Sequence, residues 1–186
     1  DKDSSTPLWS YTTGDDVYCL DISADGEYIV VGSRDNKVYL FDKDSSTPLW
    51  SSSTGDYVYS VTISVDGEYI VAGGSTKVYL FDKDSSTPLW TETFSTSTSP
   101  HPKIAMSADG EYIVYSTVCN TQCNNIDPYI KLLDKSANQI WKAGGESGDH
   151  PNKIYDLDIS ADGKYIVVGT KWGGDGDPWY DDTVYL

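Results

Sequence analysis

Four aspartates lie close together near the C-terminal end of the chain, in the segment GGDGDPWYDD at residues 173–182. Carboxylate oxygens closely spaced in a glycine-containing loop are the hard ligands that Ca²⁺ prefers. The candidate metal ligands are Asp175, Asp177, Asp181 and Asp182. Acidic loops are also expected on an acidic protein, so calcium binding and a merely solvated loop both remain open.

Aromatic side chains accompany two insertions of about a dozen residues, at 118–129 and 171–182, and each insertion contains Asp-Pro followed by an aromatic residue. Loops on a rigid scaffold are where binding function accumulates. The predicted binding surface, for a protein or a glycan, consists of Tyr129, Trp172, Trp179 and Tyr180. The alternative is that these loops only cover one another.

Cysteine and histidine offer fewer possibilities. Cys119 and Cys123 are four positions apart, a spacing that permits a small disulfide loop. Such a pair would place the protein in an oxidising compartment, outside the cell or at its surface.

His101 and His150 each precede a proline and have no further metal ligands close by in the sequence. No nucleophile elbow, phosphate loop or His-Glu-x-x-His motif is present, which favours a non-catalytic role.

The charge balance excludes two classes of partner. The 186 residues include 13 Lys and Arg against 29 Asp and Glu, a formal net charge of -16. Such a surface repels phosphate backbones and anionic membranes, so no nucleic-acid partner is expected. No apolar run of about 18 residues is present, so no membrane span is expected either.

An internal repeat organises the whole chain. The nonapeptide DKDSSTPLW occurs unchanged at residues 1–9, 42–50 and 82–90, and a degenerate copy, DKSANQIW, begins at residue 134. The chain therefore divides into four units within a single domain, and these are residues 1–41, 42–81, 82–133 and 134–186.

The pattern inside each unit is that of β-strands. In the first unit, strands are expected at residues 17–23, 27–33 and 37–43, and a fourth begins at Pro48. Asp25-Gly26 marks a hairpin turn between the first two, because glycine supplies the positive φ that a tight turn needs. No stretch has apolar residues at helical spacing, so an all-β fold of four-stranded antiparallel sheets is predicted.

Four short strands in a repeat of about 40 residues are the unit of a β-propeller blade. The stretch from Val17 to Asp42 resembles a WD repeat, through its Ser-Ala-Asp-Gly hairpin, its Gly-Ser pair and the closing Phe41-Asp42. The segment from Leu40 to Trp50 is similar to the tryptophan-docking motif of quinoprotein-type propellers. Both families include enzymes, scaffolds and surface proteins, so the resemblance implies the fold and leaves the activity open.

Two sets of in-phase aromatic residues are predicted to be structural and to pack between blades. They are Trp9, Trp50, Trp90 and Trp141, and Tyr28, Tyr69, Tyr112 and Tyr165. The sequence begins with the segment expected to form an outermost strand and ends after a third strand. Unpaired strand edges promote aggregation, so some form of closure is needed. Three forms remain open: a four-bladed ring, a ring of two chains, and part of a longer protein.

The function predicted from these features is that of a non-catalytic binding or assembly module that uses the loops of units three and four. An extracellular or cell-surface location is expected. Ca²⁺ is the one candidate cofactor, and a homodimer or higher assembly is one route to a complete ring. Two alternatives remain. One is a quinoprotein-like or other propeller enzyme, and the other is a surface-layer or filament subunit.

Overall fold

The computed structural model describes residues 3–94, 101–117, 129–144, 153–171 and 183–185. Within these ranges the regular structure consists of fifteen β-strands in four antiparallel sheets, and there is no helix that could cross a membrane. The predicted all-β fold is therefore confirmed.

Each sheet is a blade whose strands pair in chain order. Blade 1 contains β1 (Val17–Ile22), β2 (Tyr28–Ser33), β3 (Lys37–Asp42) and β4 (Trp50–Ser53). Blade 2 contains β5 (Val58–Ile63), β6 (Tyr69–Gly74), β7 (Lys77–Asp82) and β8 (Trp90–Thr93). Blade 3 contains β9 (Ile104–Met106), β10 (Tyr112–Ser116), β11 (Tyr129–Asp134) and β12 (Gln139–Gly144). Blade 4 contains β13 (Lys153–Ile159), β14 (Ile166–Lys171) and β15 (Thr183–Tyr185).

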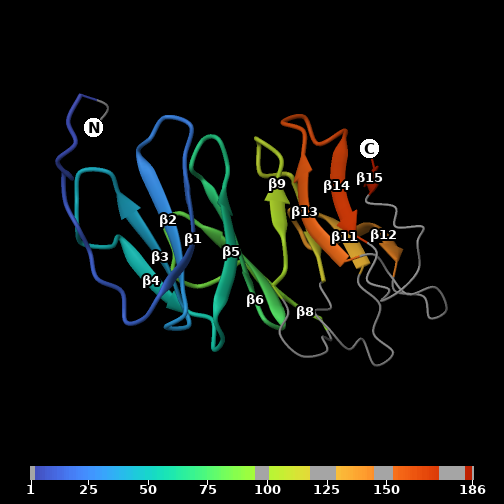
Figure 1. The fold of residues 1–186 in the computed structure, drawn as a ribbon, viewed down its shortest axis with the longest axis horizontal. Helices are drawn as coiled ribbons and strands as arrows, with labels where there is room; N and C mark the ends of the chain where they lie inside the picture. The colour runs from blue at the N-terminus through green and yellow to red at the C-terminus, as the bar shows by residue number, and fades with distance from the viewer. Residues whose placement is uncertain (1–2, 95–100, 118–128, 145–152, 172–182, 186) are drawn as a thin grey trace.

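The blades stand side by side in chain order and form an open arc (Figure 1). Blade 1 with the N-terminal segment lies at one end, and blade 4 with the C-terminus lies at the other. Substantial strand contacts between blades join only consecutive blades, as between β1 and β5 or β9 and β13. The arrangement agrees with propeller blades stacked around an axis.

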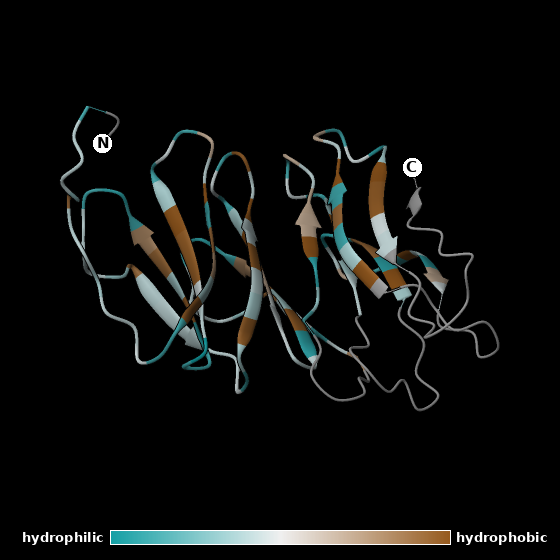
Figure 2. Ribbon diagram, in the orientation of Figure 1, coloured by the Kyte–Doolittle hydropathy of each residue, from teal (hydrophilic) through white to brown (hydrophobic). Residues whose placement is uncertain are grey.

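The core consists of three apolar layers, each between two neighbouring blades. Between blades 1 and 2, for example, Val30 and Leu40 of blade 1 belong to one apolar cluster with Val58 of blade 2, and all three are fully buried. Equivalent layers lie between blades 2 and 3 and between blades 3 and 4. Hydrophobic residues concentrate along the strands, while several of the turns are hydrophilic (Figure 2). Burying one such side chain contributes about 1.5–3 kcal/mol, so most of the stability comes from stacking the sheets.

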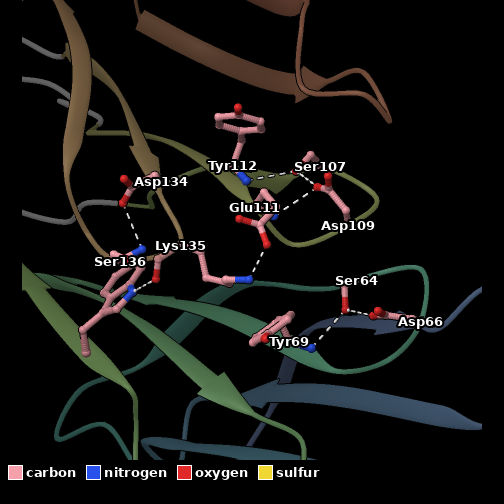
Figure 3. Close-up of polar contacts among 11 residues, drawn as sticks. Ser64, Asp66, Tyr69, Ser107, Asp109, Glu111, Tyr112, Asp134, Lys135 and Ser136 are labelled. Atoms are coloured by element: carbon pink, nitrogen blue, oxygen red, sulfur yellow. Dashed lines mark hydrogen bonds and ion pairs between the residues drawn. The ribbon is translucent and has the colours of Figure 1, made fainter.

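The turn between the first two strands of each blade is closed by a serine and an aspartate (Figure 3). In blade 2 the Ser64 hydroxyl donates to Asp66 Oδ1 at 2.6 Å and accepts the Tyr69 backbone N–H at 2.9 Å. The same bonds recur at Ser23, Ser107 and Ser160. The fourth residue of the turn, Gly67, has φ 76°, a conformation that favours glycine. The predicted Asp-Gly hairpin is thus confirmed.

The N-terminal copy of the nonapeptide differs from its later copies. Trp50 and Trp90 each begin a fourth strand, whereas residues 3–16 contain no strand. The expected outermost strand does not form there because the edge it would need, at β15, lies at the opposite end of the arc (Figure 1). Trp9 nevertheless packs on Phe41 of blade 1, with ring centroids 5.4 Å apart, as Trp50 packs on Phe81 of blade 2.

Candidate functional site

A β-bulge near the start of the innermost strand displaces one residue in three of the four blades. The register shifts between Val17 and Cys19 in β1, between Val58 and Ser60 in β5, and between Ile154 and Asp156 in β13. Each bulge leaves a tyrosine at the extra position, and these are Tyr18, Tyr59 and Tyr155. Bulges re-aim side chains, so they determine where these rings point.

The bulges of blades 1 and 2 bring several rings into contact. Tyr18 and Tyr59 are stacked, with centroids 5.4 Å apart and an interplanar angle of 11°. Tyr57 meets both rings edge-on, at 6.4 Å from Tyr18 and 6.1 Å from Tyr59. His101, from the chain entering blade 3, lies edge-on to Tyr59 at 4.2 Å. We call Tyr18, Tyr57, Tyr59 and His101 the tyrosine cluster.

The only arginine in the sequence lies beside this cluster. Arg34 is in the turn between β2 and β3, and its Cζ is 5.2 Å from the centroid of the Tyr57 ring. Its Nη1 lies 3.6 Å from Asp16 Oδ2, and its backbone N–H donates to the Asp16 carbonyl at 2.8 Å. The guanidinium is therefore held over an aromatic face, where the cation–π attraction adds to the ion pair.

The cluster is partly open to solvent. Tyr18 is 44% exposed and His101 is exposed, whereas Tyr57 and Tyr59 are half-buried. Burial raises the pKa of the Tyr59 hydroxyl, so this group stays protonated at neutral pH. Rings that fix one another's orientation present apolar surface at little entropic cost, and Tyr and Arg are enriched at the centres of protein interfaces.

The two predicted insertions are placed at the same edge of the arc by strand order. In an antiparallel meander, the start of the first strand lies beside the connection from the second strand to the third, at the same end of the strands. This end is called an edge of the arc below. The Arg34 turn is that connection in blade 1, and the connections from β10 to β11 and from β14 to β15 are its counterparts in blades 3 and 4. The insertions therefore begin and end at the edge that carries the tyrosine cluster.

Of the predicted surface residues, the structure describes only Tyr129. This side chain is half-buried, with its ring 6.3 Å from that of Tyr115 and the Lys142 ammonium 4.0 Å from its own centroid. Burial raises the pKa of Tyr129. The other predicted residues lie outside the described part of the chain, and they are Trp172, Trp179, Tyr180, Asp175, Asp177, Asp181, Asp182, Cys119 and Cys123.

Two further features concern possible metal ligands and the Cys19 thiol. Within the described ranges no group of three or more His, Cys, Asp or Glu side chains is arranged to hold a metal ion. The acidic turns that open the nonapeptide copies are Asx turns: Asp42 Oδ1 accepts the Asp44 N–H at 2.8 Å, and Asp82 Oδ1 accepts the Asp84 N–H at 2.9 Å. Cys19 is a free, half-buried thiol whose pKa is raised by burial to about 12.

Three of the four in-phase tryptophans and three of the four in-phase tyrosines pack as predicted, whereas Trp141 and Tyr165 are exposed. The indole N–H groups of Trp9, Trp50 and Trp90 donate to the carbonyls of Lys43, Lys83 and Lys135, at 2.6, 2.7 and 2.9 Å. Each tryptophan thus joins an outer segment to the next blade. Trp141 differs, because its side chain is 37% exposed.

The tyrosine cluster and Arg34 were not among the residues singled out from the sequence. One signal was available, since Tyr18, Tyr59 and Tyr155 occupy the same position in three units. The contact between them depends on the bulges and on the stacking of blades, and neither can be read from a single repeat.

The stacked four-stranded meanders define a β-propeller-type protein. Over residues 5–42, 46–82 and 145–186 the sequence matches the WD domain, G-beta repeat family (WD40). These matches cover more than half of the chain, and the chain belongs to the WD40 family.

Comparison with solved structures finds 1195 matching chains. One is hydrazine synthase from Kuenenia stuttgartiensis, with a TM-score of 0.67 and 18% sequence identity. The match covers 87% of this chain but only 46% of that one, so this chain spans less than half of the solved chain's length. At this identity the likeness shows the fold alone. No curated protein sequence matches the chain.

Proposed function

We propose that this chain is a non-catalytic scaffold that binds a partner protein through the tyrosine cluster. The WD40 propeller fold is that of a scaffold for binding and assembly, and WD40 propellers typically mediate protein interactions. The observation that carries the proposal is the stacked Tyr18–Tyr59 pair, partly exposed and flanked by Arg34. This combination of fixed rings and one arginine is typical of interface hot spots.

The charge around the cluster indicates the chemistry of the partner. Asp56 acts electrostatically on Tyr59, Asp15 acts on Arg34, and Asp16 pairs with Arg34. The whole chain carries a net charge of -16. A partner segment with an aromatic or aliphatic anchor for the rings, flanked by Lys or Arg, would complement this surface.

Ring orientation favours a protein segment over a glycan. Sugars stack on open aromatic faces, and the stacking of Tyr18 on Tyr59 removes one face of each ring from solvent. The remaining exposed ring surface lies beside one guanidinium, and this combination suits packing by an apolar side chain with a polar neighbour. A glycan partner therefore remains an outcome of the test.

The aromatic residues of the two insertions extend this proposal. Tyr129, Trp172, Trp179 and Tyr180 belong to connections that begin and end at the edge of the tyrosine cluster, so we propose that they widen the same binding surface. We also propose an extracellular or cell-surface location, supported by the spacing of Cys119 and Cys123. Mass spectrometry of the alkylated, non-reduced protein tests that disulfide.

Selection of a random 12-residue peptide library on the immobilised chain tests the function. We expect selected peptides to combine an aromatic or aliphatic anchor with Lys or Arg, and to lose at least tenfold in affinity on Tyr18→Ala, about 1.4 kcal/mol. Because Tyr18 is 44% exposed, this variant retains the fold. Leu49→Ala, an exposed position at the start of the outer strand of blade 1, is the matched control and should bind normally. Peptides that bind both variants equally, or binding to a glycan array alone, would contradict the proposal.

A further inference from the structure

Blade 1 carries uncovered apolar side chains on the side that faces away from blade 2. Val17, Leu20 and Ile22 are 50%, 67% and 53% exposed. The residues at the same positions of blade 2 are at most 8% exposed, and they are Val58, Val61 and Ile63. In blade 2 this face is covered by blade 1, so blade 1 lacks the neighbour that every other blade has on this side.

The outer half of the same face is already covered by the N-terminal segment. Tyr39 and Phe41 are 3% and 2% exposed. Tyr11 packs on both of their rings, at 5.6 Å and 5.1 Å, and Trp9 packs on Phe41. The segment TPLWSYTT at residues 6–13 matches TPLWSSST at residues 47–54, which contains the fourth strand of blade 1. Residues 9–12 thus lie where the fourth strand of a preceding blade would lie, and none of the described residues supplies the three inner strands of such a blade.

Blade 4 lacks the features that would complement blade 1, namely a fourth strand and a neighbour on its far face. Its described strands number three, β13, β14 and β15, and none of the described residues forms a fourth beside β15. On its far face Tyr165 is 61% and Val167 is 38% exposed. The counterparts of Val167 in blades 1 to 3 are fully buried, and they are Val30, Val71 and Val114.

A tyrosine-on-glycine contact repeats at each blade junction and is missing at the two ends. A β-carbon placed on Gly67 would lie 2.6 Å from Tyr28 Cδ2, because the ring sits against that glycine. The corresponding distances are 2.7 Å for Gly110 and Tyr69 and 2.4 Å for Gly163 and Tyr112. A β-carbon on Gly26 would meet nothing within 4 Å, while Tyr165 is exposed. Gly26 therefore has no tyrosine ring packed on it, and the Tyr165 ring has no glycine of a next blade to pack on.

A series of backbone hydrogen bonds joins the hairpin turns of neighbouring blades, and it ends at blade 1 and at blade 4. The N–H of Ala24 donates to the Val65 carbonyl at 3.2 Å, Val65 donates to Ala108 at 3.0 Å, and Ala108 donates to Ala161 at 3.0 Å. The N–H of Ala161 and the carbonyl of Ala24 stand at the ends of this series. One more junction of the same geometry would join them.

We propose that a second copy of this chain occupies these faces, with blade 4 of each copy docked on blade 1 of the other. Tyr165 of one copy covers Gly26 of the other, Val167 packs on Leu20, and residues 9–12 pair with β15 as the fourth strand of that blade. The junction uses the packing that the chain already repeats three times between its own blades.

Two copies are the smallest number that fills both junctions of the proposed assembly. Blade 1 and blade 4 lie at opposite ends of the arc, so the described residues of one chain do not cover both of its end faces (Figure 1). Propellers typically contain four to eight blades. A head-to-tail assembly adds four blades with each copy, so two copies give an eight-bladed ring in which both junctions are filled and no edge remains.

One pair of residues limits the strength of each proposed junction between the two copies, as comparison with the junction between blades 1 and 2 shows. Between blades 1 and 2, Asp21 Oδ2 accepts the Thr62 hydroxyl at 3.1 Å and the Ile63 N–H at 3.0 Å. At the new junction Asp158 occupies the place of Asp21, and Asp21 of the other copy occupies the place of Thr62. Two carboxylates then replace a carboxylate and a hydroxyl, so removing the charge of Asp158 strengthens association.

Sedimentation equilibrium of the 186-residue chain between about 1 and 100 µM tests the proposal. We expect a particle of two chains, each of 20.5 kDa. Leu20→Glu and Tyr165→Ala should each weaken pairing at least a hundredfold, since each change affects both junctions. Asp158→Asn should tighten pairing about tenfold. Leu49→Glu places the same charge on a residue that is 52% exposed outside both end faces, and it should leave pairing unchanged.

Folding and assembly are separated by circular dichroism. Leu20, Tyr165 and Asp158 are exposed in the single chain, so their variants should keep the β-sheet spectrum while the mass changes. Single chains at every concentration, open-ended polymers, or pairing that survives both Leu20→Glu and Tyr165→Ala would overturn the proposal. Loss of peptide binding by Tyr18→Ala with pairing intact would show that the two surfaces are independent.

Discussion

The ring of Tyr28 lies against the α-carbon of Gly67 in the next blade, so closely that a β-carbon there would be 2.6 Å from Tyr28 Cδ2. Two of the most regular features of the repeat meet in this contact. The glycine makes the hairpin turn possible, with φ 76°, and its missing side chain leaves room for the preceding blade. One residue thus serves local geometry and blade stacking together.

Gly67→Ala is expected to lower the free energy of unfolding by about 2–3 kcal/mol, because a methyl group there both strains the turn and displaces the Tyr28 ring. Gly55→Ala is the matched control. Gly55 has φ 75° but nothing within 4 Å of an added β-carbon, so it carries only the backbone strain of about 1 kcal/mol. Urea denaturation of both variants measures the difference, and equal losses would show that the ring contact contributes nothing.

Trp50→Phe is expected to cost about 1–2 kcal/mol of folding stability. The change keeps an aromatic ring near Phe81 but removes the indole N–H that donates to the Lys83 carbonyl at 2.7 Å, leaving that acceptor without this donor. Thermal unfolding followed by circular dichroism provides the measurement. Trp141→Phe serves as the comparison, since Trp141 is 37% exposed, and it should have a smaller effect.

Acid should unfold the protein only well below the ordinary pKa of aspartate. The serine hydroxyl in each hairpin turn lowers the pKa of Asp25, Asp66 and Asp109, and the Ser160 hydroxyl is the main reason that the pKa of Asp162 falls to about 2. A carboxyl whose folded pKa is depressed adds stability above its unfolded pKa of about 3.9, and this stability is lost as the pH falls through the folded value.

Ser107→Ala tests that linkage. The variant loses the hydroxyl that donates to Asp109 at 2.7 Å and accepts the Tyr112 N–H at 3.0 Å. The pKa of Asp109 should rise toward its ordinary value, and the midpoint of acid unfolding should move to higher pH. Tryptophan fluorescence between pH 5 and pH 1.5 gives the midpoint, and an unchanged midpoint would contradict the assigned cause.

Calcium binding by the acidic loop is tested by changing Asp175, Asp177, Asp181 and Asp182 together to Asn. If the loop holds Ca²⁺, the wild-type melting temperature should rise with millimolar Ca²⁺ and that of the variant should not. Asp44→Asn with Asp84→Asn, in two exposed Asx turns, removes charge elsewhere and should keep the calcium response. A wild-type melting temperature independent of Ca²⁺ would eliminate the site.

The Cys19 thiol should be almost inert in the folded protein. Burial raises its pKa to about 12, so very little thiolate is present at pH 8. A Cys119→Ser, Cys123→Ser background leaves Cys19 as the only thiol, and its reaction with a disulfide reagent should be slow until denaturant is added. Rapid reaction under native conditions would show that this part of blade 1 opens readily.

The strands were predictable because each signal for them is local. Alternating apolar residues and the Asp-Gly turn placed β1 and β2 within a residue of their observed ends, and the repeat carried the pattern to the later blades. The fourth strand begins at Trp50 rather than Pro48, since proline has no N–H for the ladder.

The tyrosine cluster and the N-terminal segment were less predictable because both depend on contacts between blades. Stacking of Tyr18 on Tyr59 requires bulges in two strands and the spacing of two sheets. Residues 9–12 have the sequence of a fourth strand, yet they remain unpaired because β15 lies at the other end of the arc. Whether a segment becomes a strand depends here on a neighbour that the local sequence does not specify.

Electron microscopy of the isolated chain tests the central claim most directly. Class averages should show a closed wheel of eight blades made from two copies, each contributing one half of the ring. Four-bladed arcs with free ends, or long rows of blades without closure, would contradict the account of how this WD40 chain completes its fold.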